Sequence, residues 1–341
     1  MYMEPEGKGG LTTSVSPRDS ESLLAAIAAS TPDPVAGIFG PASVSWRINR
    51  ESVLFLGAGR AALLQLAHPW VAAALAQHSS LMSRPIARFH NTFRVVFTMI
   101  FGSLDQALAA ARHLYSLHTQ IRGRLPAGAA RWPRGSLYQA NDIAALRWVF
   151  ATLVQSAMLA FECALGPLAA AERQQYYAEC TTLAALFGLP KAALPPDWAA
   201  FEAYIHAMHA SDELGVTDAA RTMAHNLLRG AGSWIRPPRW YRSLTIEWLH
   251  DRFRQEFALD FGTPERKAAS SARSRLPGFY KKLPPALRFT GPWREAQARL
   301  AGRSAGAPTR WSNRFWIGQP VLPSPARFAL RSAESGATIA E

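Results

Sequence analysis

The sequence predicts an all-α protein, built as one multi-helix domain. Alanine is abundant, strand-like runs are few, and apolar segments begin at capping residues and end at glycine or proline. The hydrophobic fraction of 49% and the charged fraction of 18% are typical of globular proteins. A chain of 341 residues is long enough to bury a large core.

The helices that we expect follow from these signals in chain order. They cover residues 21–29, 52–77, 85–101, 105–122, 141–165, 172–187, 198–210, 217–229 and 241–258, with two shorter helices at 264–275 and 291–301. In the first long helix, Gly57 and Gly59 allow a neighbouring helix or a flat ligand to come close to the backbone. Pro69 should kink this helix or split it in two.

The helix ends carry residues that fit their positions. Pro85 suits the first turn of its helix, Gly102 separates that helix from the next, and Ser103 is the expected N-cap of the second. Gly123 suits the C-terminus of this second helix, and a basic loop follows it. The later helices repeat these signals, with N-caps at Asn141 or Asp142, Asp197 and Thr217, and glycines at 188 and 230.

Charge and composition divide the chain into three parts. Residues 1–35 are expected to be largely disordered, 36–262 to form the helical domain, and 263–341 to form an extension rich in basic residues, proline and aromatics. The net charge is +13, of which the extension carries +10. Such an extension suits peripheral contact with an anionic membrane surface. We do not expect nucleic acid as a partner, because no recognition motif accompanies the basic residues.

The compartment that we expect is the cytoplasm. The N-terminal residues lack the apolar run of a signal peptide, and the two cysteines, Cys163 and Cys180, form no CxxC motif. The segment 61–83 has no charged residue, but Gln65, His68 and Pro69 interrupt it. The apolar segment 148–161 is too short to cross a bilayer, so we expect it to be a core helix.

The stretch from 88 to 123 concentrates polar side chains on two neighbouring helices. Arg88 and Thr92 are four residues apart and share a helix face. His113 and His118 are five residues apart, which places them about 140° from each other around their helix. Both histidines therefore cannot bind the same metal ion, and the spacing differs from that of an HExxH site.

Three strings in this region resemble one known family. They are GAGRAALLQLAHPWVAAALAQHS at 57–79, the RxxxT pair and HxxxxG within 88–123, and YQANDIAALRWVFATLVQSA at 138–157. Over roughly residues 45 to 260 the chain resembles the latex-clearing proteins (rubber oxygenases), a family that includes the fungal MpaB-type oxygenases. The resemblance implies a globin-like helical core, a haem b with a proximal histidine, and dioxygen as co-substrate. The implied reaction is cleavage of a carbon–carbon double bond in an apolar, isoprenoid-like molecule.

The resemblance also implies roles for single residues. His118 would be the iron ligand, with His113 as the second candidate. Arg88 and Thr92 would donate hydrogen bonds to dioxygen, or Arg88 would pair with a haem propionate. Arg60 and Arg94 are further candidates for the propionates. Each of these residues also has a structural alternative. The arginines could be buried and bound to carbonyl groups, the threonine could bond back along its helix, and the histidines could be core residues bonded to a carbonyl group.

Two positions depart from the family pattern. Rubber oxygenases carry a lysine beside the threonine of the RxxxT pair, and Asn91 stands there in this chain. No Asp or Glu occurs in 66–77, so His68 is the nearest substitute for the family's proton-accepting carboxylate. The alternative for His68 is a helix-end histidine bonded to a carbonyl beside Pro69. A different class of function stays open, namely a haem-binding or membrane-surface-associated helical protein without turnover. The basic, aromatic-rich extension supports this alternative.

Overall fold

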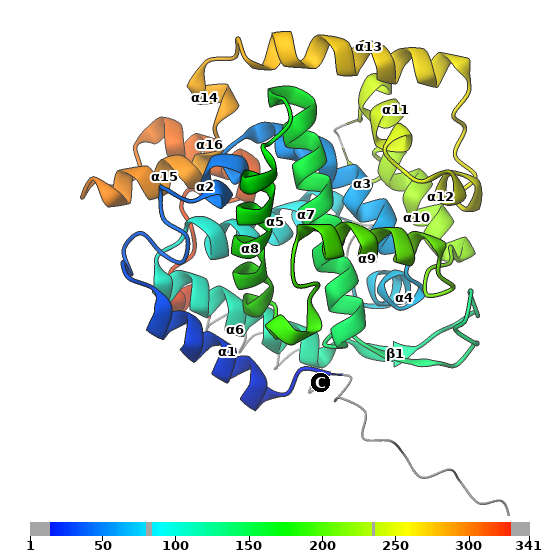
Figure 1. Ribbon diagram of the computed structural model, residues 1–341, viewed down its shortest axis with the longest axis horizontal. Coiled ribbons are helices and arrows are strands. Elements are labelled where there is room, and N and C mark those ends of the chain that lie inside the picture. The colour runs from blue at the N-terminus through cyan, green and yellow to red at the C-terminus, as the bar shows by residue number, and fades with distance from the viewer. Residues whose placement is uncertain (1–13, 80–83, 234–235, 329–341) are drawn as a thin grey trace, which may run out of the picture.

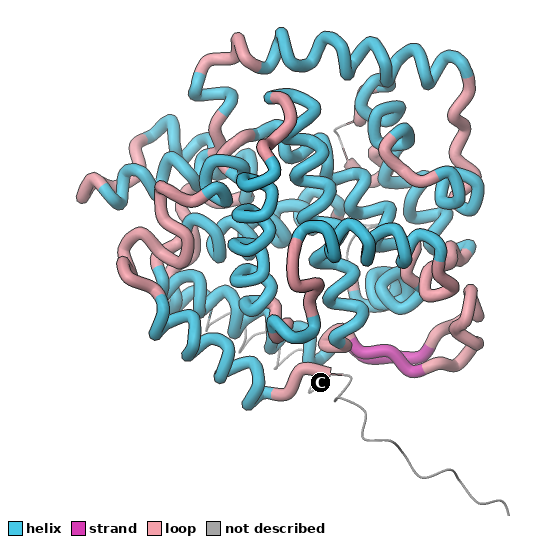
Figure 2. Tube along the Cα trace, viewed as in Figure 1, coloured by secondary structure: helices cyan, strands magenta, loops and turns pink. Residues whose placement is uncertain are grey.

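The computed structural model describes residues 14–79, 84–233 and 236–328, and within them the fold is all-α (Figure 1). The single sheet of this part is a short antiparallel hairpin of β1 (Arg122–Arg124) and β2 (Leu137–Gln139), which projects from one side of the helices (Figure 2). It forms within the segment that the sequence suggested was only a basic loop. The predicted all-α class is confirmed.

Two helices form the centre of the fold. These are α3 (Phe55–Leu66), preceded by the 3₁₀ turn η1 (Ser52–Leu54), and α7 (Ile143–Leu165). A Cβ atom at Gly57 would lie 2.3 Å from the carbonyl oxygen of Ser156, so only glycine permits this close crossing. Trp148 Nε1 donates to the carbonyl oxygen of Leu64 at 2.9 Å. Among the described residues α7 alone has the length and hydropathy of a membrane span, but it packs in the main core cluster.

The remaining helices surround this pair (Figure 1). They are α1 (Pro17–Ser30), α2 (Val44–Asn49), α4 (Pro69–His78), α5 (Pro85–Phe101), α6 (Leu104–Gln120), α8 (Ala170–Leu186), η2 (Lys191–Ala193), α9 (Trp198–Ala210), α10 (Asp218–Arg229), α11 (Arg239–Glu247), α12 (Asp251–Glu256), α13 (Thr263–Tyr280), α14 (Pro285–Arg288), α15 (Gly291–Leu300) and α16 (Ala307–Ile317). Pro69 splits the first long helix, as predicted, because its ring cannot continue the hydrogen-bonding pattern of α3.

The helix expected at 21–29 is present as α1, which begins earlier, at Pro17, so residues 17–30 of the segment expected to be largely disordered are helical. Ser16 and Asp19 make a capping box at its start, and Pro17 occupies the first turn. Leu24 and Ile27 are buried in a cluster with apolar residues of α6. Local capping and one apolar stripe are therefore enough to order this helix. Residues 1–13 lie outside the described part of the chain.

The single helix expected at 241–258 is instead two, α11 and α12. The sequence has no glycine or proline at the break. His250 caps α12 by accepting a hydrogen bond from the backbone amide of Arg252. Arg60 Nε donates a hydrogen bond to the carbonyl oxygen of Trp248, and Arg254 Nη1 donates one to the carbonyl oxygen of Leu249. Arginine side chains thus satisfy the carbonyl groups that the interrupted helix leaves free.

The C-terminal extension packs on the helical domain over its described length. Helix α13 lies along α11 (Figure 1), and α15 and α16 lie against α5. Behind α14, the buried carboxylate of Glu51 accepts two hydrogen bonds from Arg288, at 2.7 and 2.9 Å, and one from the Tyr280 hydroxyl at 3.0 Å. The boundary at 262/263 stays a prediction, and the described part of the extension packs against the helices that precede it. Residues 329–341, where we expected a disordered end, lie outside the described part.

Candidate functional site

The α5–α6 pair places the two main candidate residues at the same end. Ser103 caps α6, as predicted from the sequence, and it exchanges hydrogen bonds with Gln106. A Cβ atom at Gly102 would lie 2.4 Å from the carbonyl oxygen of Thr98, which explains the glycine in this tight connection. Since the two helices run antiparallel from this corner, Arg88 near the start of α5 lies level with His118 near the end of α6.

His118 is a neutral imidazole within the fold. Burial, and secondly the positive charge of Arg88, lower the pKa of His118 to about 4. The side chain nevertheless keeps a partly accessible surface. Within residues 14–79, 84–233 and 236–328, no protein group forms a hydrogen bond with its ring. A partly accessible imidazole without such a partner has its ring nitrogens available to solvent or to a ligand.

Arg88 shares the surroundings of His118. Burial lowers the pKa of Arg88, although the side chain is only half-buried by its accessible surface. Its charge is the one that acts on His118, so the two side chains are neighbours. A guanidinium group stays protonated in proteins even when its pKa falls. The site therefore combines a neutral nitrogen ligand with a fixed positive charge.

Thr92 lies one turn beyond Arg88 on α5. Its hydroxyl donates to the carbonyl oxygen of Arg88 at 3.0 Å, which is the structural alternative that the sequence left open. The hydroxyl oxygen can still accept a hydrogen bond while its proton is used in this way. Asn91, at the position of the family's lysine, is exposed and accepts a hydrogen bond from Arg94. Asn91 therefore belongs to the outer face of α5.

Arg60 is held by protein groups throughout. It is 4% exposed, and it donates to the carbonyl oxygen of Trp248, to Ser156 Oγ and to Gln155 Oε1 at 2.7–2.8 Å. These bonds join α3 to α7 and to the end of α11. The structure thus gives Arg60 the structural role that the sequence offered as an alternative, and it does not bring Arg60 to His118.

Arg94 also has a structural role. Its Nε and Nη2 atoms both donate to the carbonyl oxygen of Ile317, at 3.0 and 2.9 Å, and the side chain is 8% exposed. This contact fixes the end of α16 on α5. A haem propionate could bind Arg94 only by displacing these bonds, so the propionate role predicted for Arg94 gains no support.

His68 caps α4 instead of donating to a freed carbonyl group. Its Nδ1 accepts a hydrogen bond from the backbone amide of Trp70 at 3.3 Å, and the residue is 2% exposed. Its ring lies 6.1 Å from that of Trp70 and 6.0 Å from that of Trp132. Burial first, and then the charge of Arg131, lower the pKa of His68 to about 4. A neutral ring could accept a proton, and the proton-accepting role of His68 stays a prediction.

His113 points away from His118, as their spacing predicts. It is buried, and its ring lies 5.2 Å from that of Phe328 in the C-terminal extension. The two histidines of α6 therefore have separate environments. His118 has the ring that is available to a ligand.

A polar network behind His118 was not predicted from the sequence. The Tyr138 hydroxyl donates to Gln77 Oε1 at 2.7 Å and contacts His78 Nε2 at 3.2 Å. A Cβ atom at Gly123 would lie 2.6 Å from this hydroxyl. The backbone amide of Ile121 bonds the carbonyl oxygen of His118 itself. The glycine of HxxxxG and the tyrosine of YxAxD thus fit against each other, and together they fix the end of α6. Both strings were visible in the sequence, but the sequence did not indicate that they contact each other.

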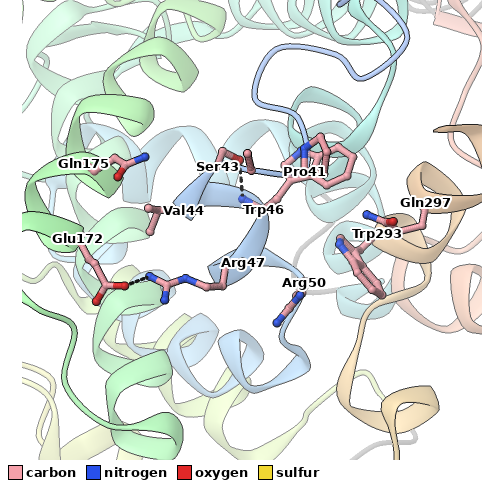
Figure 3. A pocket seen from close by; sticks show the side chains of 11 residues that line it. Pro41, Ser43, Val44, Trp46, Arg47, Arg50, Glu172, Gln175, Trp293 and Gln297 are labelled. Carbon is pink, nitrogen blue, oxygen red and sulfur yellow. Dashed lines mark hydrogen bonds and ion pairs between the residues drawn. The ribbon is translucent and has the colours of Figure 1, made fainter.

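A surface groove of about 300 Å³ lies elsewhere, between α2, α8 and α15 (Figure 3). An ion pair between Arg47 and Glu172 crosses it, and the guanidinium of Arg50 lies 5.5 Å from the ring of Trp293. No residue that the sequence singled out for the site lines this groove. We therefore place the candidate site at His118.

The donor set at His118 is compatible with a haem. Within the described ranges, no group of three or more His, Cys, Asp or Glu side chains could hold a metal ion by itself. A haem iron needs no such group, because the porphyrin supplies four ligands and one protein side chain can complete the attachment. A neutral histidine whose ring has no hydrogen-bond partner among the described residues meets that need.

The comparisons with known proteins agree with the sequence resemblance. The family model for the catalytic domain of ER-bound oxygenase mpaB/B' and rubber oxygenase matches residues 46–282. Neither the search of curated proteins nor the search of solved structures found a match. The family match spans well over half of the chain and includes every candidate residue. The chain therefore belongs to the mpaB and rubber oxygenase catalytic-domain family.

Proposed function

We propose that this protein is a haem b-dependent oxygenase that uses dioxygen to cleave a carbon–carbon double bond in an apolar, isoprenoid-like substrate. Membership of the family supports an oxygenase. The observation that carries the haem proposal is the ring of His118, which is neutral, partly accessible and without a hydrogen bond from the described residues. The haem, when bound, supplies the iron that activates dioxygen.

The residues around the site have distinct roles in this proposal. His118 offers one nitrogen lone pair and needs to lose no proton near neutral pH, because its pKa is about 4. Arg88 keeps a positive charge beside it, which suits a propionate carboxylate through a two-pronged hydrogen bond. The Thr92 hydroxyl donates its hydrogen bond to the carbonyl oxygen of Arg88. While this bond is present, Thr92 can accept a hydrogen bond from a ligand but cannot donate one. The network of Tyr138 and Gln77 fixes the helix end that carries the ligand.

Aromatic side chains on α5 give the proposed substrate an apolar neighbour. Phe89 and Phe93 are half-buried, their ring centroids are 4.5 Å apart, and each follows a candidate residue directly in the sequence. In contrast, Phe97, Met99 and Phe101 are 0–2% exposed and belong to core clusters. These three residues therefore line the core, and only the first turns of α5 remain for a substrate channel.

The first test is the absorption spectrum of the protein expressed with ample haem. The wild type should show a strong haem band at one haem per chain, and His118→Ala should lose or shift that band. His113→Ala is the matched control, since it removes a histidine from another face of the same helix, and it should keep the band. A wild type without haem, or a band unchanged in His118→Ala, would contradict the proposal.

The second test separates an oxygenase from a haem-binding protein without turnover. Oxygen uptake is measured with a series of isoprenoid alkenes, and carbonyl products are trapped with a hydrazine. We expect uptake coupled to two carbonyl groups for each double bond cleaved, and we expect Arg88→Gln to reduce it. Haem binding without uptake for any alkene would favour the alternative function and refute the proposed reaction.

A further inference from the structure

Helix α16 presents two of its three aromatic side chains outward. Trp311 is 67% exposed and Phe315 is 51% exposed, and they lie one turn apart on the same side. On the opposite side, Ser312 and Asn313 are buried. A helix of a soluble domain keeps its large apolar side chains on the inner side, as Trp316 and Ile317 are here, so the two outward aromatics are unusual. Packing among the described residues leaves most of Trp311 and about half of Phe315 accessible.

The buried polar side of α16 is firmly attached, so its orientation is fixed. Arg294 Nη2 donates to Ser312 Oγ at 2.9 Å, and Asn313 Nδ2 donates to Glu295 Oε2 at 2.6 Å. On the same inner side, the ring of Trp316 stacks on that of Phe55 at 3.9 Å. Turning Trp311 inward would break all of these contacts. The outward position of the aromatics is thus imposed by the fold.

Basic side chains accompany the exposed aromatics. Arg310 and Arg314 are exposed and neighbour Trp311 and Phe315 around the helix. Between residues 266 and 328 the chain has thirteen Lys and Arg and a single acidic residue, Glu295. The carboxylate of Glu295 is bound to Asn313 and to the backbone amide of Leu322. No acidic side chain of this segment is therefore left to neutralise the outer surface.

Helix α14 is linked to α16 by one arginine. Arg294 Nη2, which donates to Ser312 of α16, also donates to the carbonyl oxygen of Ala286 in α14 at 2.9 Å. Leu287 on α14 is 58% exposed, and Lys281 and Lys282 before it are exposed. These helices lie beyond residue 282, where the family match ends. The surface is thus an addition to the catalytic domain of the family.

We propose that the outer face of α16, formed by Arg310, Trp311, Arg314 and Phe315, binds the surface of an anionic lipid bilayer. Indole and phenyl rings enter the headgroup region, while guanidinium groups pair with lipid phosphates and carboxylates. A nucleic-acid duplex is bound largely through its phosphates, which needs basic groups but no exposed apolar rings beside them. The combination of both on one face favours the membrane.

The test is co-sedimentation of the full-length protein with vesicles of phosphatidylcholine alone and of phosphatidylcholine with 30% phosphatidylserine. We expect binding to the anionic vesicles only. Arg310→Ala/Arg314→Ala should weaken it roughly 30-fold, at about fivefold for each basic residue. Trp311→Ser/Phe315→Ser should weaken it by roughly tenfold or more. The matched controls, Arg18→Ala/Arg229→Ala and Leu137→Ser, change exposed residues of other elements and should leave binding unchanged.

A second measurement keeps the proposal testable if a double variant folds poorly. Brominated phosphatidylcholine in the anionic vesicles should quench tryptophan fluorescence in the wild type more than in Trp311→Phe. Equal quenching in both, or no binding to anionic vesicles, would overturn the proposal. So would binding of duplex DNA or RNA that depends on Arg310 and Arg314, or a dimer in solution that Trp311→Ser dissociates.

Discussion

Lowering the pH of the haem-free protein should reveal the neutral state of His118 as a loss of stability. The pKa of His118 is about 4 in the folded protein and about 6.5 in the unfolded chain. Between these values the unfolded chain binds more protons, so the free energy of unfolding falls as the pH is lowered. The loss from His118 alone is about 2 kcal/mol at pH 5 and about 3 kcal/mol at pH 4.

Urea unfolding followed by circular dichroism between pH 7.5 and 4.5 measures this loss. The pKa values of His68 and His209 are also lowered to about 4, so only the difference between variants isolates His118. His118→Ala should lose about 2 kcal/mol less than the wild type between pH 7.5 and 5. Leu137→Ser, which changes an exposed residue and removes no imidazole, should follow the wild type. Parallel pH profiles for His118→Ala and the wild type would refute the burial of a neutral imidazole at this position.

Two further predictions concern packing. Glu51→Ala removes the buried carboxylate that holds Arg288, so it should lower the free energy of unfolding by about 3–5 kcal/mol in a urea titration. The control is Glu21→Ala, which breaks an exposed ion pair and should lower the free energy of unfolding by less than about 1 kcal/mol. Similar costs for the two would contradict this assignment. Gly123→Ala should destabilise by about 1–3 kcal/mol and weaken haem retention, because the new methyl group meets the Tyr138 hydroxyl. Tyr138→Phe in the Gly123→Ala background should restore part of this loss, and no restoration would contradict the contact.

Local signals in the sequence were sufficient for much of the fold. Ser103 with Gln106, Asp142, Asp197 and Thr217 each cap the helix that was predicted to begin there. Their physical effect depends on residues within one turn, so no distant partner needs to be known. The break between α11 and α12 could not be found in this way. Its carbonyl groups are satisfied by arginines, and Arg60 comes from a segment 188 residues away.

The same difference applies to the candidate site. Periodicity placed His113 and His118 on different faces of α6, and the structure gives them separate environments. Periodicity gave no information about which acceptor an arginine finds. Arg60 and Arg94 bind backbone carbonyl groups of distant segments. Every residue has a backbone carbonyl group, so the sequence does not indicate which one accepts the hydrogen bond. The contact between Gly123 and Tyr138 was hidden for a similar reason, since both strings were visible but not their pairing.

The hydrogen bond between Arg94 and Ile317 joins α5 of the catalytic domain to α16 of the C-terminal extension. One end of α5 carries Arg88 beside His118, and its outer side holds α16 through Arg94 and through His90, which contacts the carbonyl oxygen of Phe315 at 3.0 Å. A chain shortened to the end of the family match would leave the buried Arg94 guanidinium without this acceptor. The extension therefore braces the helix that carries the site, and a force that lifted α16 would act directly on α5 through these two contacts.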